Sequence, residues 1–122
     1  MSAEMNMQIQ NFKQLIVWQK GMQLVSEIYK ITKQFPKSEV YALAGQMQRA
    51  AVAIPSNIAE GHRRNHKPEF IQFLGIALGS AAELETQILI AEQEYPECNY
   101  NQAKVLVDEV QRMLNVIINK LK

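Results

Sequence analysis

The sequence predicts an all-α protein that folds as one antiparallel, up-down-up-down four-helix bundle over residues 12–122. Apolar residues recur at steps of three and four along four separate segments, and no segment alternates with the period of a strand. The segments are joined by short connections, which place successive helices antiparallel. With 122 residues, the chain is long enough for one core and too short for two.

The first helix is expected over residues 12–35, because Pro36 ends the apolar pattern. The residues expected to face the core are Leu15, Trp18, Met22, Val25, Tyr29 and Thr32, and Ile28 and Phe35 widen this stripe. Residues 1–11 are polar and lack both the charged start and the apolar core of a signal peptide. We expect them to form a flexible tail.

The second helix is expected over residues 39–61. Ser38 can cap its start and Gly61 can end it, since serine favours helix starts and glycine favours helix ends. Pro55 lies inside the pattern and removes one backbone donor. It predicts either a bend in one helix or a break after Ile54.

The third helix is expected over residues 67–94 and the fourth over residues 100–121, each with a continuous apolar stripe. Small residues gather in the middle of the third helix. Gly75 and Gly79 there would each cost about 1 kcal/mol relative to alanine. The close approach of another helix, in this chain or in a partner, would explain them.

Composition excludes several classes of protein. Hydrophobic residues make up 48% and charged residues 20%, which is typical of a soluble globular domain and excludes disorder. The one cysteine, Cys98, excludes a disulfide framework and fits a reducing compartment. No uninterrupted run of about 18 apolar residues is present, so we expect no membrane span and a cytoplasmic protein.

Motifs that carry catalysis are missing. The chain has no phosphate-binding loop, nucleophile elbow or zinc-protease motif. His62 and His66 lie four residues apart, but two further metal ligands are lacking. Cys98 has no histidine partner that would activate it. We therefore expect no catalytic residue, no metal, no cofactor and no enzymatic activity.

Polar residues interrupt the apolar stripe of the second helix. Asn57 and Glu60 lie three residues apart and share a helix face. A polar group that faces the core must find partners, because leaving it unsatisfied costs about 1–3 kcal/mol. The residues of the expected polar network are Arg49, Asn57, Glu60, Ser80 and Glu83. Ligand binding and plain surface exposure are the alternatives.

The same region carries a resemblance to a known family. The motifs are Val17-Trp18-Gln19-Lys20, Phe35-Pro36, Glu39-Val40-Tyr41-Ala42-Leu43, Arg49-Ala50-Ala51, Ile54-Pro55-Ser56-Asn57-Ile58-Ala59-Glu60-Gly61, Glu69-Phe70 and Glu83-Leu84-Glu85. Through them, nearly the whole chain after residue 14 resembles the bacterial four-helix-bundle proteins encoded in intervening sequences of 23S ribosomal RNA genes.

The resemblance implies a left-handed bundle that assembles into a ring-shaped homopentamer. It also implies a similarity in fold to the accessory protein of diversity-generating retroelements, which binds nucleic acid and a reverse transcriptase. Family members often have a serine cap where this chain has His66, followed here by Pro68. The turn before the third helix is therefore more basic and less well capped than the family pattern.

Charge is unevenly distributed along the chain. The net charge of +1 combines +5 over residues 1–67, from nine basic and four acidic residues, with −4 over residues 68–122, from four basic and eight acidic residues. The densest basic segment connects the second and third helices, next to a helix N-terminus that favours anions. The expected nucleic-acid-binding residues are His62, Arg63, Arg64, Lys67 and, on the first helix, Lys20.

Two functions follow as hypotheses. The first is a homo-oligomer that binds RNA or DNA through its basic half. The second is an assembly scaffold or protein-partner module, including an accessory factor of a reverse transcriptase. A solvated basic turn, or salt bridges between subunits, are the alternatives for residues 62–67.

Overall fold

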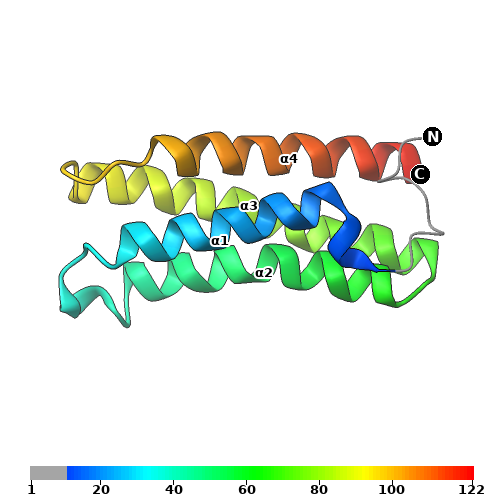
Figure 1. The fold of residues 1–122 in the computed structure, drawn as a ribbon, viewed down its shortest axis with the longest axis horizontal. Coiled ribbons are helices and arrows are strands. Elements are labelled where there is room, and N and C mark those ends of the chain that lie inside the picture. The colour runs from blue at the N-terminus through cyan, green and yellow to red at the C-terminus, as the bar shows by residue number, and fades with distance from the viewer. Residues whose placement is uncertain (1–10) are drawn as a thin grey trace.

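The computed structural model describes residues 11–122 and confirms the all-α four-helix bundle (Figure 1). Its helices are α1 (Ile16–Thr32), α2 (Leu43–Arg63), α3 (Lys67–Glu94) and α4 (Asn101–Leu121), with short 3-10 helices η2 (Phe12–Gln14) and η3 (Lys37–Glu39). The tail predicted at residues 1–11 lies outside the described residues except for Asn11. The Asn11 side chain accepts a hydrogen bond from the Lys13 amide at 2.9 Å.

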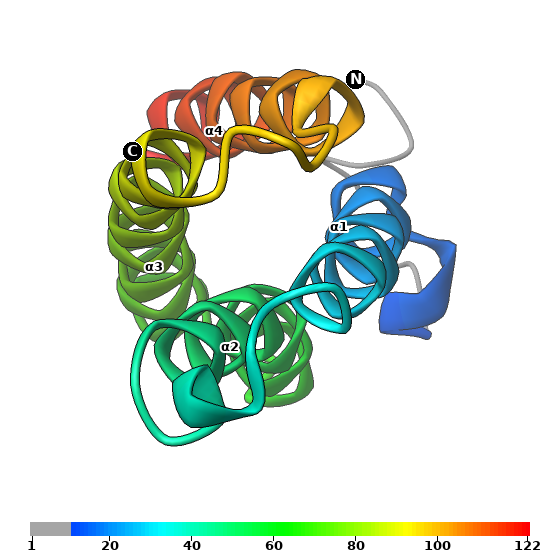
Figure 2. The same ribbon diagram turned by 90° about the vertical axis from the view of Figure 1, so that its left-hand side faces the viewer.

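The helices run alternately along the long axis of the bundle, and each packs against two neighbours (Figure 2). The α1–α2 and α3–α4 connections therefore lie at one end, and the α2–α3 turn lies at the other (Figure 1). The side chains buried most completely include Leu24, Ile28, Met47, Ile54, Leu74, Leu84 and Leu114, so all four helices contribute to one core.

The face of the first helix that meets the core was predicted only in part. Leu15, Ile28, Thr32 and Phe35 are buried as expected, and Trp18 and Val25 are partly buried against the core. Val17, Leu24 and Ile28 are fully buried, whereas Met22 and Tyr29 are 44% and 43% exposed. The apolar spacing was correct, but α1 has two parallel apolar stripes. The stripe with Val17, Leu24 and Ile28 packs inward, and the one that carries Trp18 lies along α2.

Gly61 does not end α2, which continues to Arg63. The chain turns instead at Asn65, which adopts the left-handed conformation with φ of 51°. Gly61 is needed for packing: a Cβ atom there would lie 2.6 Å from the Cβ of Phe73 and 3.2 Å from the Phe70 ring. The expected stop was wrong because a glycine that permits close helix approach looks the same in sequence as a cap.

Pro55 neither breaks α2 nor starts a new helix, because α2 is continuous from Leu43 to Arg63. The proline ring is buried and faces Gly21 of α1, where an added Cβ would lie 3.5 Å from two of its carbons. The expected start at Ser38 was also displaced, since residues 37–39 form η3 and α2 begins at Leu43.

A side-chain contact joins the two connections at one end of the bundle. The Tyr95 hydroxyl donates a 2.6 Å hydrogen bond to a Glu39 carboxylate oxygen, and the Tyr95 ring stacks on Phe35 at 4.7 Å between centroids. The hydrogen bond to Glu39, followed by burial, raises the pKa of Tyr95 from 10.0 to about 12.

This pKa predicts an alkaline loss of stability. Because the pKa of Tyr95 is higher in the folded state, the contribution of its neutral phenol is complete below pH 10 and is lost as pH rises to about 12. We expect Tyr95→Phe to be less stable than the wild type below pH 10 and to lose less stability above it. Urea unfolding across this pH range measures the difference, with Tyr29→Phe as the control for an exposed tyrosine. Parallel pH curves for wild type and Tyr95→Phe would contradict the assignment.

Candidate nucleic-acid interface

The α2–α3 turn carries less free charge than its sequence suggests. The Arg64 guanidinium pairs with Glu60 at 3.2 Å and with Glu69 at 3.3 Å, and it lies 5.2 Å from the centre of the Phe73 ring. His66 Nδ1 lies 3.4 Å from a Glu69 carboxylate oxygen. Between residues 60 and 69, three basic residues face two carboxylates, which leaves a formal charge of +1.

Two of the five predicted binding residues remain exposed without an ion pair in the described part of the chain. Arg63 lies over the Phe12 ring at 5.7 Å, and Lys67 begins α3. His62 is buried with its ring edge-on to Phe70, and Lys20 pairs with Glu109 of α4 at 3.4 Å. The structure therefore brings only Arg63 and Lys67 together as free charge at the turn.

Free positive charge continues along α1 and α2 beyond the turn. Residues 11–67 contain nine basic residues, and all but Lys20 and Arg64 lack an ion pair within the described chain. These seven are Lys13, Lys30, Lys33, Lys37, Arg49, Arg63 and Lys67. Lys30, Lys33 and Lys37 lie at the opposite end of the bundle from the α2–α3 turn and were not singled out from the sequence, although their spacing alone signals a second basic cluster.

The predicted polar network is not formed as one unit. The Asn57 amide donates to the Ala53 carbonyl of its own helix at 2.7 Å, and Glu60 pairs with Arg64 on the surface. Arg49, Ser80 and Glu83 do lie together: with Gln46 they line a polar hollow of about 390 Å³ between α2 and α3. Helix register is thus not set by a buried ion pair among these five residues.

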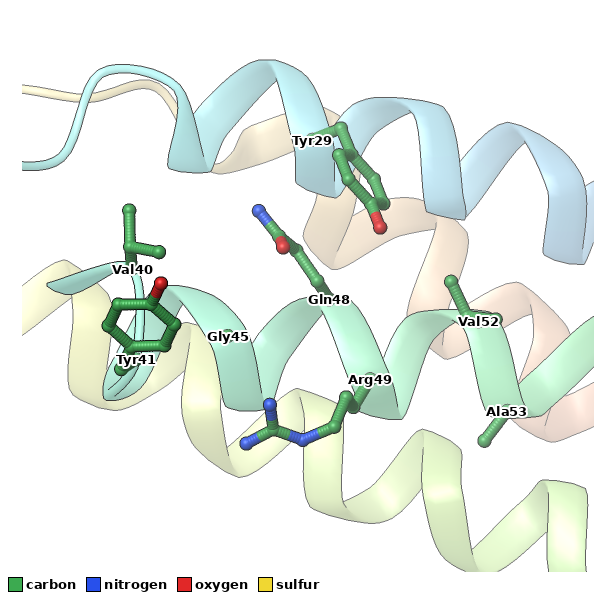
Figure 3. A pocket seen from close by; sticks show the side chains of 8 residues that line it. All are labelled: Tyr29, Val40, Tyr41, Gly45, Gln48, Arg49, Val52 and Ala53. Carbon is green, nitrogen blue, oxygen red and sulfur yellow. The ribbon is translucent and has the colours of Figure 1, made fainter. Parts of the chain in front are cut away.

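Two further hollows follow the seam between α1 and α2. One, of about 320 Å³, is lined by the outer apolar stripe of α1 and by α2, with Trp18, Met22 and Val52 among its residues. The other, of about 480 Å³, lies where the α1–α2 connection meets α2 (Figure 3). Val52 borders both hollows, so the two form one interrupted groove.

The outer face of α3 is apolar and uncovered in the described structure. Ile76, Leu89 and Ile90 are between 43% and 50% exposed. A Cβ atom added to Gly75 or Gly79 would meet nothing within 4 Å, so the close approach expected at these glycines does not occur within the described chain. We call Gly75, Ile76, Gly79, Leu89 and Ile90 the α3 outer face.

By length and composition, α3 is the one described helix that could cross a membrane. In the bundle, 33% of its most apolar window is buried. The sequence has no uninterrupted apolar run of this length, but a window that contains one or two charged residues can still have a high mean hydropathy. The core helices of soluble proteins pass the same test. Among the described residues, no three histidine, cysteine or acidic side chains are grouped so as to hold a metal ion.

The family model described as 23S rRNA-intervening sequence protein matches residues 13–116, which include all of α1, α2 and α3 and most of α4. No curated protein matches the chain.

Proposed function

This chain belongs to the 23S rRNA-intervening sequence protein family, and we propose that it is a non-enzymatic, cytoplasmic homo-oligomer that binds RNA through its basic side. The observation that carries the proposal is the set of seven basic side chains, between η2 and the first residue of α3, that have no ion pair in residues 11–122. Neutralising these charges with phosphates would release counterions, which is the main source of affinity in nucleic-acid binding.

The α2–α3 turn supplies one contact region. Arg63 and Lys67 are exposed next to the start of α3, where backbone donors favour an anion. Arg64 bridges Glu60 and Glu69 across the turn, so it fixes the turn geometry rather than offering charge. In a closed oligomer the region would repeat on every subunit, and its weak individual contacts would act together.

Charge reversal at the turn tests RNA binding. We expect the double variant Arg63→Glu, Lys67→Glu to weaken binding to a structured RNA. The slope of log affinity against log salt concentration should fall by about 2, since two phosphate contacts are removed. Fluorescence anisotropy between about 50 and 200 mM salt measures both quantities. A carboxylate at position 67 is favourable to the dipole at the start of α3, whereas one at position 63, the last residue of α2, is mildly unfavourable, and circular dichroism verifies that the variant folds.

The matched control is Lys120→Glu, Lys122→Glu, which makes the same change in net charge at the end of α4. We expect the salt slope of this control to differ from that of the wild type only by the effect of the lower net charge. Equal losses in the two double variants would show that the turn has no specific role. No binding by the wild type at low salt would overturn the proposed function.

Self-assembly is the second part of the proposal. The α3 outer face offers apolar side chains beside two glycines that leave room for another helix. The basic residues concentrate before residue 68 and the acidic ones after it, so a head-to-tail contact between copies would bring opposite charges together. Such contacts form a ring where the rotation between successive copies closes, and a ring of five is what the resemblance implies.

An assembly scaffold or protein-partner module without RNA binding is the alternative function. It includes an accessory factor for a reverse transcriptase, and the exposed α3 outer face is the observation that favours it. Nuclease-treated pull-down would recover a protein partner under this alternative, whereas RNA binding should be lost on nuclease treatment. The genes next to this one would also distinguish the two: a ribosomal RNA gene, or a reverse transcriptase with template repeats.

A further inference from the structure

We propose that the hollow where the α1–α2 connection meets α2 binds an unpaired base of single-stranded RNA. Tyr41 would be the stacking surface and Arg49 the contact to a neighbouring phosphate. This site, which we call the Tyr41 pocket, is lined by Tyr29, Val40, Tyr41, Gly45, Gln48, Arg49, Val52 and Ala53. The inference rests on the proposed RNA binding and adds to it a preference for unpaired strands.

The Tyr41 pocket has the size and composition of a small-ligand site. Its volume is about 480 Å³, within the range of pockets that hold small molecules. Tyr29 enters from α1, Tyr41 stands on the connection, and Arg49 lies along the lower edge of α2 (Figure 3). Two aromatic rings, one guanidinium and one amide thus surround a single hollow.

Tyr41 is almost fully exposed to solvent, and no packing contact in the described chain explains why an aromatic residue stands there. Its side chain is 95% exposed, and no hydrogen bond or ring contact holds it within the described residues. Val40, beside it, is 53% exposed. An exposed ring next to an apolar wall is the arrangement on which single-stranded nucleic-acid binders stack bases, because every base offers an apolar face.

The backbone around the pocket is closely fitted. A Cβ atom on Gly45 would lie 2.6 Å from the Val40 carbonyl oxygen, so the connection packs directly on the first turns of α2. The Gln48 amide donates to the Thr32 hydroxyl at 3.1 Å, and that hydroxyl donates to the Ile28 carbonyl at 2.9 Å. The floor is therefore held in place before any ligand binds, which reduces the entropy lost on binding.

The charge around the pocket fits a polyanionic strand. Arg49 has no ion pair in the described chain, and Lys30, Lys33 and Lys37 come from the end of α1 and from η3. Lys33 lies four residues, about one helical turn, after Tyr29. Of the two acidic residues near the pocket, Glu39 is engaged by the Tyr95 hydroxyl, and Glu83 of α3 lines the polar hollow that Arg49 also borders, without an ion pair to it. A strand whose base enters the pocket would therefore pass basic groups on both sides.

The experiment compares two RNA probes and three variants of the full chain. One probe is a labelled single strand of about 12 nucleotides, and the other is the same strand in a perfect duplex. The variants are Tyr41→Ala, Tyr41→Phe and Arg49→Gln. Because Tyr41 and Arg49 are exposed, their replacement should leave the fold intact, and circular dichroism confirms this for each variant. Light scattering records the oligomeric state of each protein.

We expect Tyr41→Ala to lower the affinity for the single strand by about tenfold to a hundredfold, as for loss of one stacked base. The affinity of Tyr41→Ala for the duplex should not change, and neither should the slope of its log affinity against log salt concentration. Tyr41→Phe should keep single-strand affinity, because the ring is retained. Arg49→Gln should lower the single-strand salt slope by about 0.7, the value for one phosphate contact on a single strand.

Three results would overturn the inference. The first is wild-type single-strand binding that Tyr41→Ala leaves unchanged, in which case the proposed RNA binding stands and the pocket does not. The second is an equal loss with Tyr41→Ala on both probes. The third is a change of oligomeric state in Tyr41→Ala, which would assign the pocket to a contact between copies. Failure of the wild type to bind either probe would instead refute the proposed function itself.

Discussion

Replacing Gly61 with alanine is expected to lower the free energy of unfolding by about 1–3 kcal/mol, the usual cost of overfilling a well-packed core. The added Cβ would lie 2.6 Å from the Phe73 Cβ atom and 3.4 Å from the Phe70 carbonyl oxygen. Neither atom is the far end of a flexible side chain, so α3 as a whole must move away from α2. This effect outweighs the gain of up to about 1 kcal/mol in helix propensity that alanine brings.

Gly75→Ala is the matched control, because the same substitution in α3 meets nothing within 4 Å. Within the protomer only the propensity term acts, so at a protein concentration that keeps the chain a single protomer we expect the unfolding free energy to rise by up to about 1 kcal/mol. Urea unfolding of both variants, at equal protein concentration, measures the opposite signs. A stabilised Gly61→Ala protein would show that α2 and α3 approach less closely than the structure has them.

If the chain self-assembles as proposed, the double variant Ile76→Glu, Ile90→Glu is expected to be a single protomer of 13.9 kDa. Both side chains lie on the α3 outer face, and an apolar helix contact would have to bury two carboxylates without partners. Light scattering coupled to gel filtration gives the mass of the wild type and of the variant. Because both positions are exposed in the protomer, circular dichroism and thermal unfolding should stay close to the wild type.

Val105→Glu, Val116→Glu serves as the control for this change, since both valines are more than half exposed on α4. We expect it to keep the mass of the wild type. Loss of assembly in this control, with the α3 variant unaffected, would move the contact from α3 to α4. A wild type that remains a single protomer at micromolar concentration would refute self-assembly.

The bounds and the buried face of a helix could be predicted where that helix has one apolar stripe. The bounds expected for the third helix agree with α3, and those of the fourth agree with α4 to within one residue. In α1 the spacing predicts the helix but only part of its buried face, because Val17 and Leu24 are seven residues apart, as are Trp18 and Val25. Packing against α2 and α4 decides which stripe is buried.

The candidate site was predicted less well, because free charge depends on contacts between distant segments. Lys20 is neutralised by Glu109, a residue of a different helix, which no local pattern reveals. Arg64 is bound by Glu60 and Glu69, whose proximity requires the turn at Asn65. The Tyr41 pocket was likewise invisible in sequence, since Tyr41 has no periodic neighbour and its exposure follows from the path of the connection.

The hydrogen bond between Tyr95 and Glu39 also has a mechanical consequence. It connects the α1–α2 hairpin to the α3–α4 hairpin at the end of the bundle where both connections lie (Figure 1). Glu39 precedes Tyr41 by two residues, so this hydrogen bond restrains the segment that carries the pocket. Backbone amides of residues 40–42 should accordingly exchange with solvent faster in Tyr95→Phe, which makes hydrogen exchange a readout of how firmly the two hairpins hold each other.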